Sequence, residues 1–211
     1  MEELRYRQVH LDFHTSEFIP DVGKDFNAEE FAEKLHNANV DSVTCFARCH
    51  HGWFYYPSKK FPELIHPNLV NKNLLLDQIK ACHKRGIKVP IYTTVQWDGR
   101  IMREHPEWLA LDENGEFINT QKTSEHYFYD TICLNSGYRQ FFKEFLQDVI
   151  DVVGAENIDG FFMDILFAVD CNCENCRKKM DGLRMDSSSK LERLRYSQYM
   201  LDEFKREITA F

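Results

Sequence analysis

Residues 158–167 read IDGFFMDILF, a run that is apolar nearly throughout. Continuous apolarity over so short a run predicts a strand buried on both faces, as strands of parallel sheets are. Asp164 interrupts it, placing a carboxylate among phenylalanine, isoleucine and leucine side chains. The run therefore predicts a parallel sheet with a carboxylate at the end of one strand.

Three earlier runs also predict strands: QVHLDFHT (8–15), DSVTCFARC (41–49) and IKVPIYTTVQW (87–97). The last contains Pro90, which suits the beginning of a strand better than its middle. Helical spacing of apolar residues, with Asn27 as an N-cap and Gly86 and Gly154 as C-terminal stops, predicts helices between and after the strands. The four predicted helices span 27–39, 68–86, 135–154 and 187–208, and the last has an apolar stripe formed by Leu191, Leu194, Leu201, Phe204 and Ile208.

Four strands alternating strictly with four helices predict an α/β fold with a parallel sheet. We expect a (β/α) barrel of the TIM type, with about half of its eight units present in this chain. A small open sheet is the alternative. A half barrel leaves unpaired edges, which natural proteins normally cover. We therefore expect residues 1–211 to form a single domain that is the N-terminal part of a longer barrel.

Composition disfavours some classes of partner and indicates a cellular compartment. The net charge of −8 provides no basic stripe for nucleic acid and disfavours an anionic membrane surface. The beginning of the chain has no apolar segment typical of a signal peptide, and no run is long enough to span a bilayer. Seven cysteines, several inside predicted strands or helices, fit a reducing compartment. We therefore predict a cytoplasmic protein.

The carboxyl ends of the predicted strands carry an unusual set of side chains. In parallel barrels the working groups sit at these ends. Aromatic rings stack on the apolar faces of sugars, and histidine or carboxylate groups bind hydroxyls. The set predicts a site for a polyol ring, and its members are His14, His50, His51, Trp53, Trp97 and Asp164.

Each of these residues also has a structural interpretation. Asp164 is either a nucleophile or base beside the reacting carbon, or a side chain that caps the following loop. His50 and His51 are adjacent, which favours contact with a ligand over burial of one ring in the core. Trp53 and Trp97 fit packing at the barrel mouth as well as they fit sugar binding.

A cysteine cluster, CNCENC, follows the fourth predicted strand. Cys171, Cys173 and Cys176 offer three thiolates at a spacing typical of zinc sites. A structural zinc ion needs a fourth ligand, for which Cys49, His50 or a residue beyond Phe211 are the candidates. Reduced thiols without metal are the alternative. A metal here is expected to fix the loop after Asp164.

Several segments together resemble glycoside hydrolases. RCHHGWFYYPS (48–58) resembles the His-His-x-Gly-Phe segment of family 29 α-L-fucosidases. VHLDFHTSEF (9–18), REHPEW…DENGEF (103–117) and DGFFMDILF…CNCENC (159–176) are similar to related hypothetical glycoside hydrolases, a group that includes family 151 α-L-fucosidases. The similarity extends over most of the chain and implies the N-terminal part of a catalytic barrel.

The resemblance implies roles for individual residues. Asp164 matches the fucosidase nucleophile, His50 and His51 match the paired sugar-binding histidines, and His14 matches a further histidine that contacts the sugar. The chain departs from the usual Lys-His-His-Asp-Gly pattern. Cys49 precedes the histidine pair and Gly52 follows it directly. The aspartate that lies between the pair and the glycine in the usual pattern is therefore absent.

We therefore expect a retaining exo-glycoside hydrolase of the α-L-fucosidase type that needs no cofactor for catalysis. Retaining enzymes use a second carboxyl group as general acid and base, and the sequence offers none that is convincing. An enzyme without that group is expected to be inactive. The alternatives are a β-galactosidase-like barrel, a non-catalytic carbohydrate-binding module and a zinc-stabilised interaction module. The expected partner is a small glycoside or oligosaccharide, and assembly into a homo-oligomer is left open.

Overall fold

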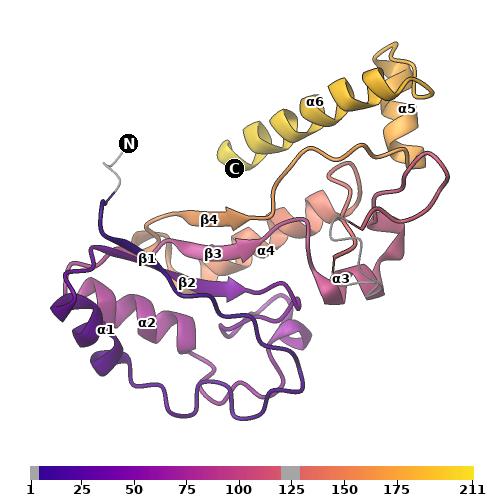
Figure 1. Ribbon diagram of the computed structural model, residues 1–211. Helices are drawn as coiled ribbons and strands as arrows, with labels where there is room; N and C mark the ends of the chain where they lie inside the picture. Colours follow the sequence, from indigo (N-terminus) through magenta and orange to yellow (C-terminus); the bar gives the residue numbers. More distant parts are fainter. Residues whose placement is uncertain (1–4, 120–128) are drawn as a thin grey trace. The chain divides into compact units, whose positions relative to one another are not determined.

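The computed structural model describes residues 5–119 and 129–211. Four strands form one sheet in the order β1 (Gln8–His10), β2 (Ser42–Arg48), β3 (Ile91–Thr94) and β4 (Phe161–Asp164). β1 pairs in parallel with β2, and β2 pairs in parallel with β3. β4 runs beside β3 in the same direction (Figure 1). Because a helix follows every strand, the chain forms half of a (β/α)8 barrel, as predicted.

The helices alternate with the strands along the chain. α1 (Ala28–Asn37) lies between β1 and β2, α2 (Leu74–His83) between β2 and β3, and α4 (Tyr138–Val153) between β3 and β4. α3 (Gly99–Glu104) precedes α4, and α5 (Glu174–Gly182) and α6 (Lys190–Thr209) follow β4. Three short 3-10 turns complete the elements: Pro62–Leu64, Pro106–Trp108 and Ala155–Asn157.

The chain divides into two compact units. The first unit comprises Met1–Thr93 and Phe145–Asp164, and the second comprises Thr94–Glu144 and Ile165–Phe211. The sheet belongs almost entirely to the first unit. None of the helices in the described ranges is long and apolar enough to cross a membrane.

The core of the first unit is built on β2, whose seven residues are all buried. The register pairs Phe46 of β2 with Tyr92 of β3, and their rings stack with centroids 3.7 Å apart. α2 packs against β2, and α1 packs against α2. The Asn27 side chain accepts a hydrogen bond from the backbone N–H of Glu30, so it caps α1 as predicted.

The burial of β4 differs from the prediction. Its residues are half-buried or exposed, and the Phe162 side chain is 44% exposed. The strand is at one edge of the sheet. The apolar run correctly indicated a strand, but burial on both faces was wrong for an edge position.

The second unit has a separate small core that joins α5 and α6 to the segment before α4. Its buried residues are Ala110, Cys133, Cys171, Cys176, Met180, Tyr196 and Met200, and the residues packed against them are Ile118, Val169, Cys173 and Met185. The predicted apolar stripe of α6 is correct at Leu201, Phe204 and Ile208, which are buried. It is wrong at Leu191 and Leu194, which are exposed. The buried face of α6 there consists of Arg193, Tyr196 and Ser197 instead.

Candidate active site

The candidate site lies in the first unit, around the ends of the parallel strands. Asp164 is the last residue of β4, and His50 follows β2 by two residues. Tyr92 is in β3, between these two strands. Because the strands are parallel and adjacent, three side chains that are distant in sequence meet at one edge.

Tyr92 connects the other two residues. Its hydroxyl donates to Asp164 Oδ2 over 2.7 Å and lies 2.9 Å from His50 Nε2. The hydroxyl proton is directed at the carboxylate, so the ring nitrogen of His50 donates to the tyrosine oxygen. His50 Nε2 also lies 3.6 Å from Asp164 Oδ2. The carboxylate is thus oriented by a tyrosine that is itself fixed by a histidine.

His14 supports His50 from the end of the first strand. The two imidazoles stack with centroids 4.0 Å apart, and the backbone N–H of His50 donates to His14 Nδ1 over 3.1 Å. His14 must therefore carry its proton on Nε2, which lies 2.9 Å from Asp12 Oδ1. The geometry places His14 where it positions His50.

Burial sets the charge state of these groups. Burial, and after it the neighbouring His14, lowers the pKa of His50 to about 4, against the attraction of Asp164. The pKa of His14 is also lowered, mainly by burial. Burial and the hydrogen bond to Asp164 raise the pKa of Tyr92 well above its usual value. At neutral pH the site therefore holds two neutral imidazoles and a protonated phenol.

Asp164 remains accessible despite these contacts, with a side chain that is 37% exposed. The residue after it, Ile165, has φ of 55°, in the left-handed region that β-branched residues seldom adopt. Such a conformation costs about 1 to 3 kcal/mol and is most common near functional sites. The backbone therefore turns sharply directly after the carboxylate.

The other predicted sugar-binding residues are placed differently. His51 is half-buried directly beside His50. The Trp53 indole N–H donates to Glu17 over 3.3 Å, and its ring packs on the apolar cluster of the first unit. Trp97 belongs to the second unit, where it is 9% exposed and packs edge-on against Tyr129. The geometry described above thus joins His14, His50 and Asp164, but neither tryptophan.

Tyr92 was missed by the sequence analysis. It lies within a predicted strand, where a tyrosine is ordinarily a core residue. In the structure Tyr92 pairs with Phe46 of β2, and the two rings stack on one face of the sheet. This register is known only once the strands are paired.

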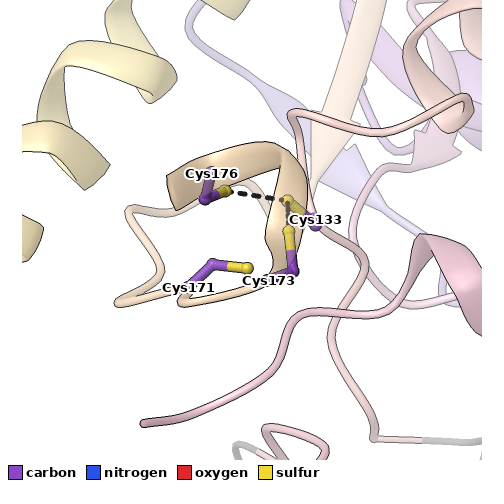
Figure 2. A group of neighbouring side chains, drawn as sticks. All are labelled: Cys133, Cys171, Cys173 and Cys176. Atoms are coloured by element: carbon purple, nitrogen blue, oxygen red, sulfur yellow. Dashed lines mark hydrogen bonds between the residues drawn. The ribbon is translucent and has the colours of Figure 1, made fainter. Parts of the chain in front are cut away.

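The cysteine cluster lies in the second unit and has a fourth member. The sulfur atoms of Cys133, Cys171, Cys173 and Cys176 all lie within 4.8 Å of one another, and the four can hold a metal ion (Figure 2). Neither candidate named from the sequence completes the set. His50 belongs to the Asp164 site, and the Cys49 thiol faces the backbone oxygen of Thr15. Cys133 was overlooked because it is 38 residues from Cys171 in sequence.

Comparison with known proteins identifies relatives of this chain. A family model described as hypothetical glycosyl hydrolase 6 matches residues 27–165, a range that includes His50, His51 and Asp164. The structure is similar to α-L-fucosidase isoenzyme 2 from Paenibacillus thiaminolyticus, with 38% identity and a TM-score of 0.84. The match covers 97% of this chain and 30% of that chain, so this sequence spans less than a third of that relative.

Two further solved structures share the fold at low identity. A hypothetical protein from Ruminiclostridium thermocellum ATCC 27405 is 12% identical, with a TM-score of 0.58, over 94% of this chain and 92% of its own. The α-fucosidase of Thermotoga maritima, in complex with a mechanism-based inhibitor, is 17% identical, with a TM-score of 0.50, over 70% and 31%. A search of curated proteins found no match. On the extent of the family match and the identity to the Paenibacillus enzyme, the chain belongs to the hypothetical glycosyl hydrolase 6 family.

Proposed function

We propose that this chain carries the nucleophile half of a retaining exo-glycosidase of the α-L-fucosidase type. The observation that carries the proposal is the accessible carboxylate of Asp164 at the end of β4, held by the Tyr92 hydroxyl at 2.7 Å. Membership of a glycosyl hydrolase family and similarity to a protein named α-L-fucosidase support the sugar class.

In the proposed reaction, an Asp164 carboxylate oxygen attacks the anomeric carbon as the bond to the leaving oxygen breaks. A second carboxyl group protonates the leaving oxygen and later takes a proton from the water that releases the sugar. We assign no residue of this chain to that role. The hydrogen bond from Tyr92 holds the carboxylate in one orientation, which reduces the ordering needed to reach the transition state.

The histidines are proposed to bind the sugar. His50 and His51 would hold hydroxyl groups, and neutral imidazole suits this task because it both donates and accepts hydrogen bonds. His14 would act mainly by fixing the His50 ring, with which it stacks. Trp53 is proposed to bound the sugar pocket, because an aromatic ring offers the apolar surface on which a sugar face packs.

We further propose that residues 1–211 form one (β/α) domain that is the N-terminal part of a longer glycosidase barrel. Its four β/α units, against eight in a complete barrel, support this. The chain's coverage of 30% of the Paenibacillus fucosidase agrees with it. The proposed partner is a small glycoside or oligosaccharide. Hydrolysis of this type requires no cofactor. Assembly into a homo-oligomer is compatible with the proposal. The proposed compartment is the cytoplasm.

The proposal is tested with 2,4-dinitrophenyl α-L-fucoside, whose leaving group departs without a general acid. We expect this chain to release about one equivalent of dinitrophenol in a burst. Asp164→Asn, which removes the nucleophile at constant size, should release none. Asp151→Asn is the matched control, because it removes an exposed carboxylate of the same unit and should retain the burst.

The outcomes separate the alternatives. Steady turnover would mean that the acid and base function is also present in this chain. A burst with the matching β-galactoside, and none with the fucoside, would favour a β-galactosidase-like enzyme. Failure of the folded chain with every aryl glycoside, together with sugar binding, would favour a carbohydrate-binding module and refute the proposed catalysis.

A further inference from the structure

The four cysteine sulfurs of the second unit are spaced like the corners of a metal-centred tetrahedron. With zinc–sulfur bonds of ~2.3 Å, tetrahedral geometry separates the sulfurs by about 3.8 Å. Cys133 Sγ lies 3.8 Å from Cys173 Sγ and 3.4 Å from Cys176 Sγ. All four lie within 4.8 Å of one another, and Figure 2 shows them converging on one point from separate segments.

The surroundings favour thiolates. Cys173 is the N-cap of α5, and Cys176 is in its first turn. The positive end of the helix dipole stabilises negative charge at these positions. The backbone N–H of Asn135 donates to Cys133 Sγ over 3.3 Å, the kind of outer hydrogen bond that orients metal ligands.

The geometry points to a structural zinc ion bound by Cys133, Cys171, Cys173 and Cys176, with Cys133 as the fourth ligand. Four protein thiolates close the coordination sphere and leave no position for water or substrate, so this centre has no catalytic step. The inference is independent of the proposed glycosidase activity, because all four ligands belong to the second unit and Asp164 to the first.

The centre would join three segments that are otherwise held by a small core. Cys133 follows the bridge between Leu109 and Ile132, Cys171 and Cys173 are in the loop after β4, and Cys176 is in α5. One ion at this point closes a long loop of chain and fixes α5 in place. The apolar cluster around it, with Tyr196 and Met200 of α6, buries the thiols of Cys133, Cys171 and Cys176.

Disulfide bonding fits the arrangement less well. All seven cysteines are free, and the sulfur atoms of Cys133 and Cys176 are 3.4 Å apart, against ~2.05 Å in a disulfide. Two disulfides would also divide the set into pairs, whereas Cys133 has close approaches to two other sulfurs. Iron is the other metal that a site of four tetrahedral thiolates binds, so the identity of the metal has to be measured.

The first test is the metal content of the chain purified under reducing conditions. We expect one zinc ion per chain, released by a thiol-modifying mercurial and detected with a metallochromic dye. Cys133→Ser should lower zinc affinity by more than about 100-fold. Cys49→Ser is the matched control, because Cys49 is equally buried and was the alternative ligand from the sequence. It should keep its zinc.

Stability gives a second readout. Removal of zinc by a strong chelator should lower the thermal unfolding midpoint by more than about 5 °C, and added zinc should restore it. A chain that contains no metal and is unaffected by chelator overturns the inference. So does a chain that contains iron in place of zinc, or a Cys133→Ser variant that retains zinc at full affinity.

A spectroscopic test does not depend on whether Cys133→Ser folds. Cobalt(II) bound to the metal-free wild-type chain should show the intense thiolate charge-transfer and tetrahedral d–d bands of a four-sulfur site. Cys173→His, at the most accessible ligand, should keep the tetrahedral bands and lose part of the charge-transfer intensity. An octahedral cobalt spectrum, or one unchanged by Cys173→His, contradicts the assignment.

Discussion

At the scale of single residues, the site depends on how Asp164 is held. An accessible carboxylate can rotate, and a nucleophile that samples several orientations attacks less effectively. Here the Tyr92 hydroxyl contacts Oδ2 at 2.7 Å, and the ring of Tyr92 is itself fixed by stacking on Phe46. The orientation of the carboxylate is therefore set by the core of the first unit.

Removal of the Tyr92 hydroxyl tests this interpretation. Tyr92→Phe should keep the ring stack and lower the burst rate with the dinitrophenyl fucoside by about 10- to 100-fold, the effect of one hydrogen bond to a charged group. Stability should change by no more than about 1 kcal/mol, since water can replace the lost donor. Burst kinetics and thermal unfolding measure the two effects.

The control for that variant is Tyr55→Phe. Tyr55 is buried in the same unit, and its hydroxyl bonds Thr15 rather than the Asp164 group. An equal loss of rate in both variants would show that the effect is structural, and would contradict a specific role for Tyr92.

His50 makes stability depend on pH. Its pKa in the folded chain is about 4, against 6.5 when exposed, so between these values only the unfolded chain binds the proton. Stability is therefore unaffected by this group above pH 6.5 and is lost as the pH falls towards 4. At pH 5 the loss from His50 should be about 2 kcal/mol relative to pH 7.5.

The measurement is urea unfolding at both pH values for the wild type and for His50→Gln. His14 and His66, whose pKa values are also lowered, act in the same direction in both proteins. The difference between the two proteins isolates His50. Equal pH dependence in the two would refute the assignment of a buried, neutral His50.

The sequence selected some residues of the candidate site and missed others, for clear physical reasons. The strand-end rule selected His14, His50 and Asp164, because the position after a parallel strand can be inferred from local pattern alone. Tyr92 and Cys133 act through partners at least 38 residues away in sequence, with His50 and Cys171 among them. Only the folded chain specifies such pairings.

At the scale of elements, local sequence signals predicted the presence of a helix better than they predicted its first residue. α1 begins after its predicted cap, Asn27, because the cap is a local hydrogen bond. α2 begins at Leu74 rather than near residue 68, since Asn71 binds the side chain of Asp77 and the backbone of Asn73 in a turn before the helix. α5 was not predicted at all, because its sequence is mostly polar.

One buried carboxylate attaches α4 to the segment after the paired histidines. Asp148 accepts hydrogen bonds from the hydroxyls of Tyr56 and Ser58 and from the backbone N–H groups of Lys59 and Lys60. Asp148→Asn cannot accept all four and should lower the free energy of unfolding by about 3 kcal/mol. Urea denaturation measures the change.

Asp151→Asn, on the same helix, is the control. Asp151 is exposed and bonds only an exposed glutamine in the contacts described, so its replacement should change stability by less than about 0.5 kcal/mol. A small loss in Asp148→Asn, comparable with this control, would contradict the role given to the buried carboxylate.

At the scale of the whole molecule, strict alternation of strands and helices predicted the half barrel correctly. Alternation works because a parallel connection needs a crossover helix, so the order of elements constrains the sheet. The order did not reveal the division into two compact units. That division depends on long-range packing, such as the ion pairs of Arg139 and Lys143 with Glu203 and Glu207 of α6.

The central claim is that Asp164 forms a covalent bond with the sugar. A 2-deoxy-2-fluoro-L-fucosyl fluoride tests it most directly, because fluoride leaves without an acid and the C2 fluorine slows release of the intermediate. The account predicts a mass increase of one fluorofucosyl group per chain, mapped by peptide mass spectrometry to Asp164 and absent from Asp164→Asn. A folded chain that takes no label, or that takes it on another residue, would contradict the account.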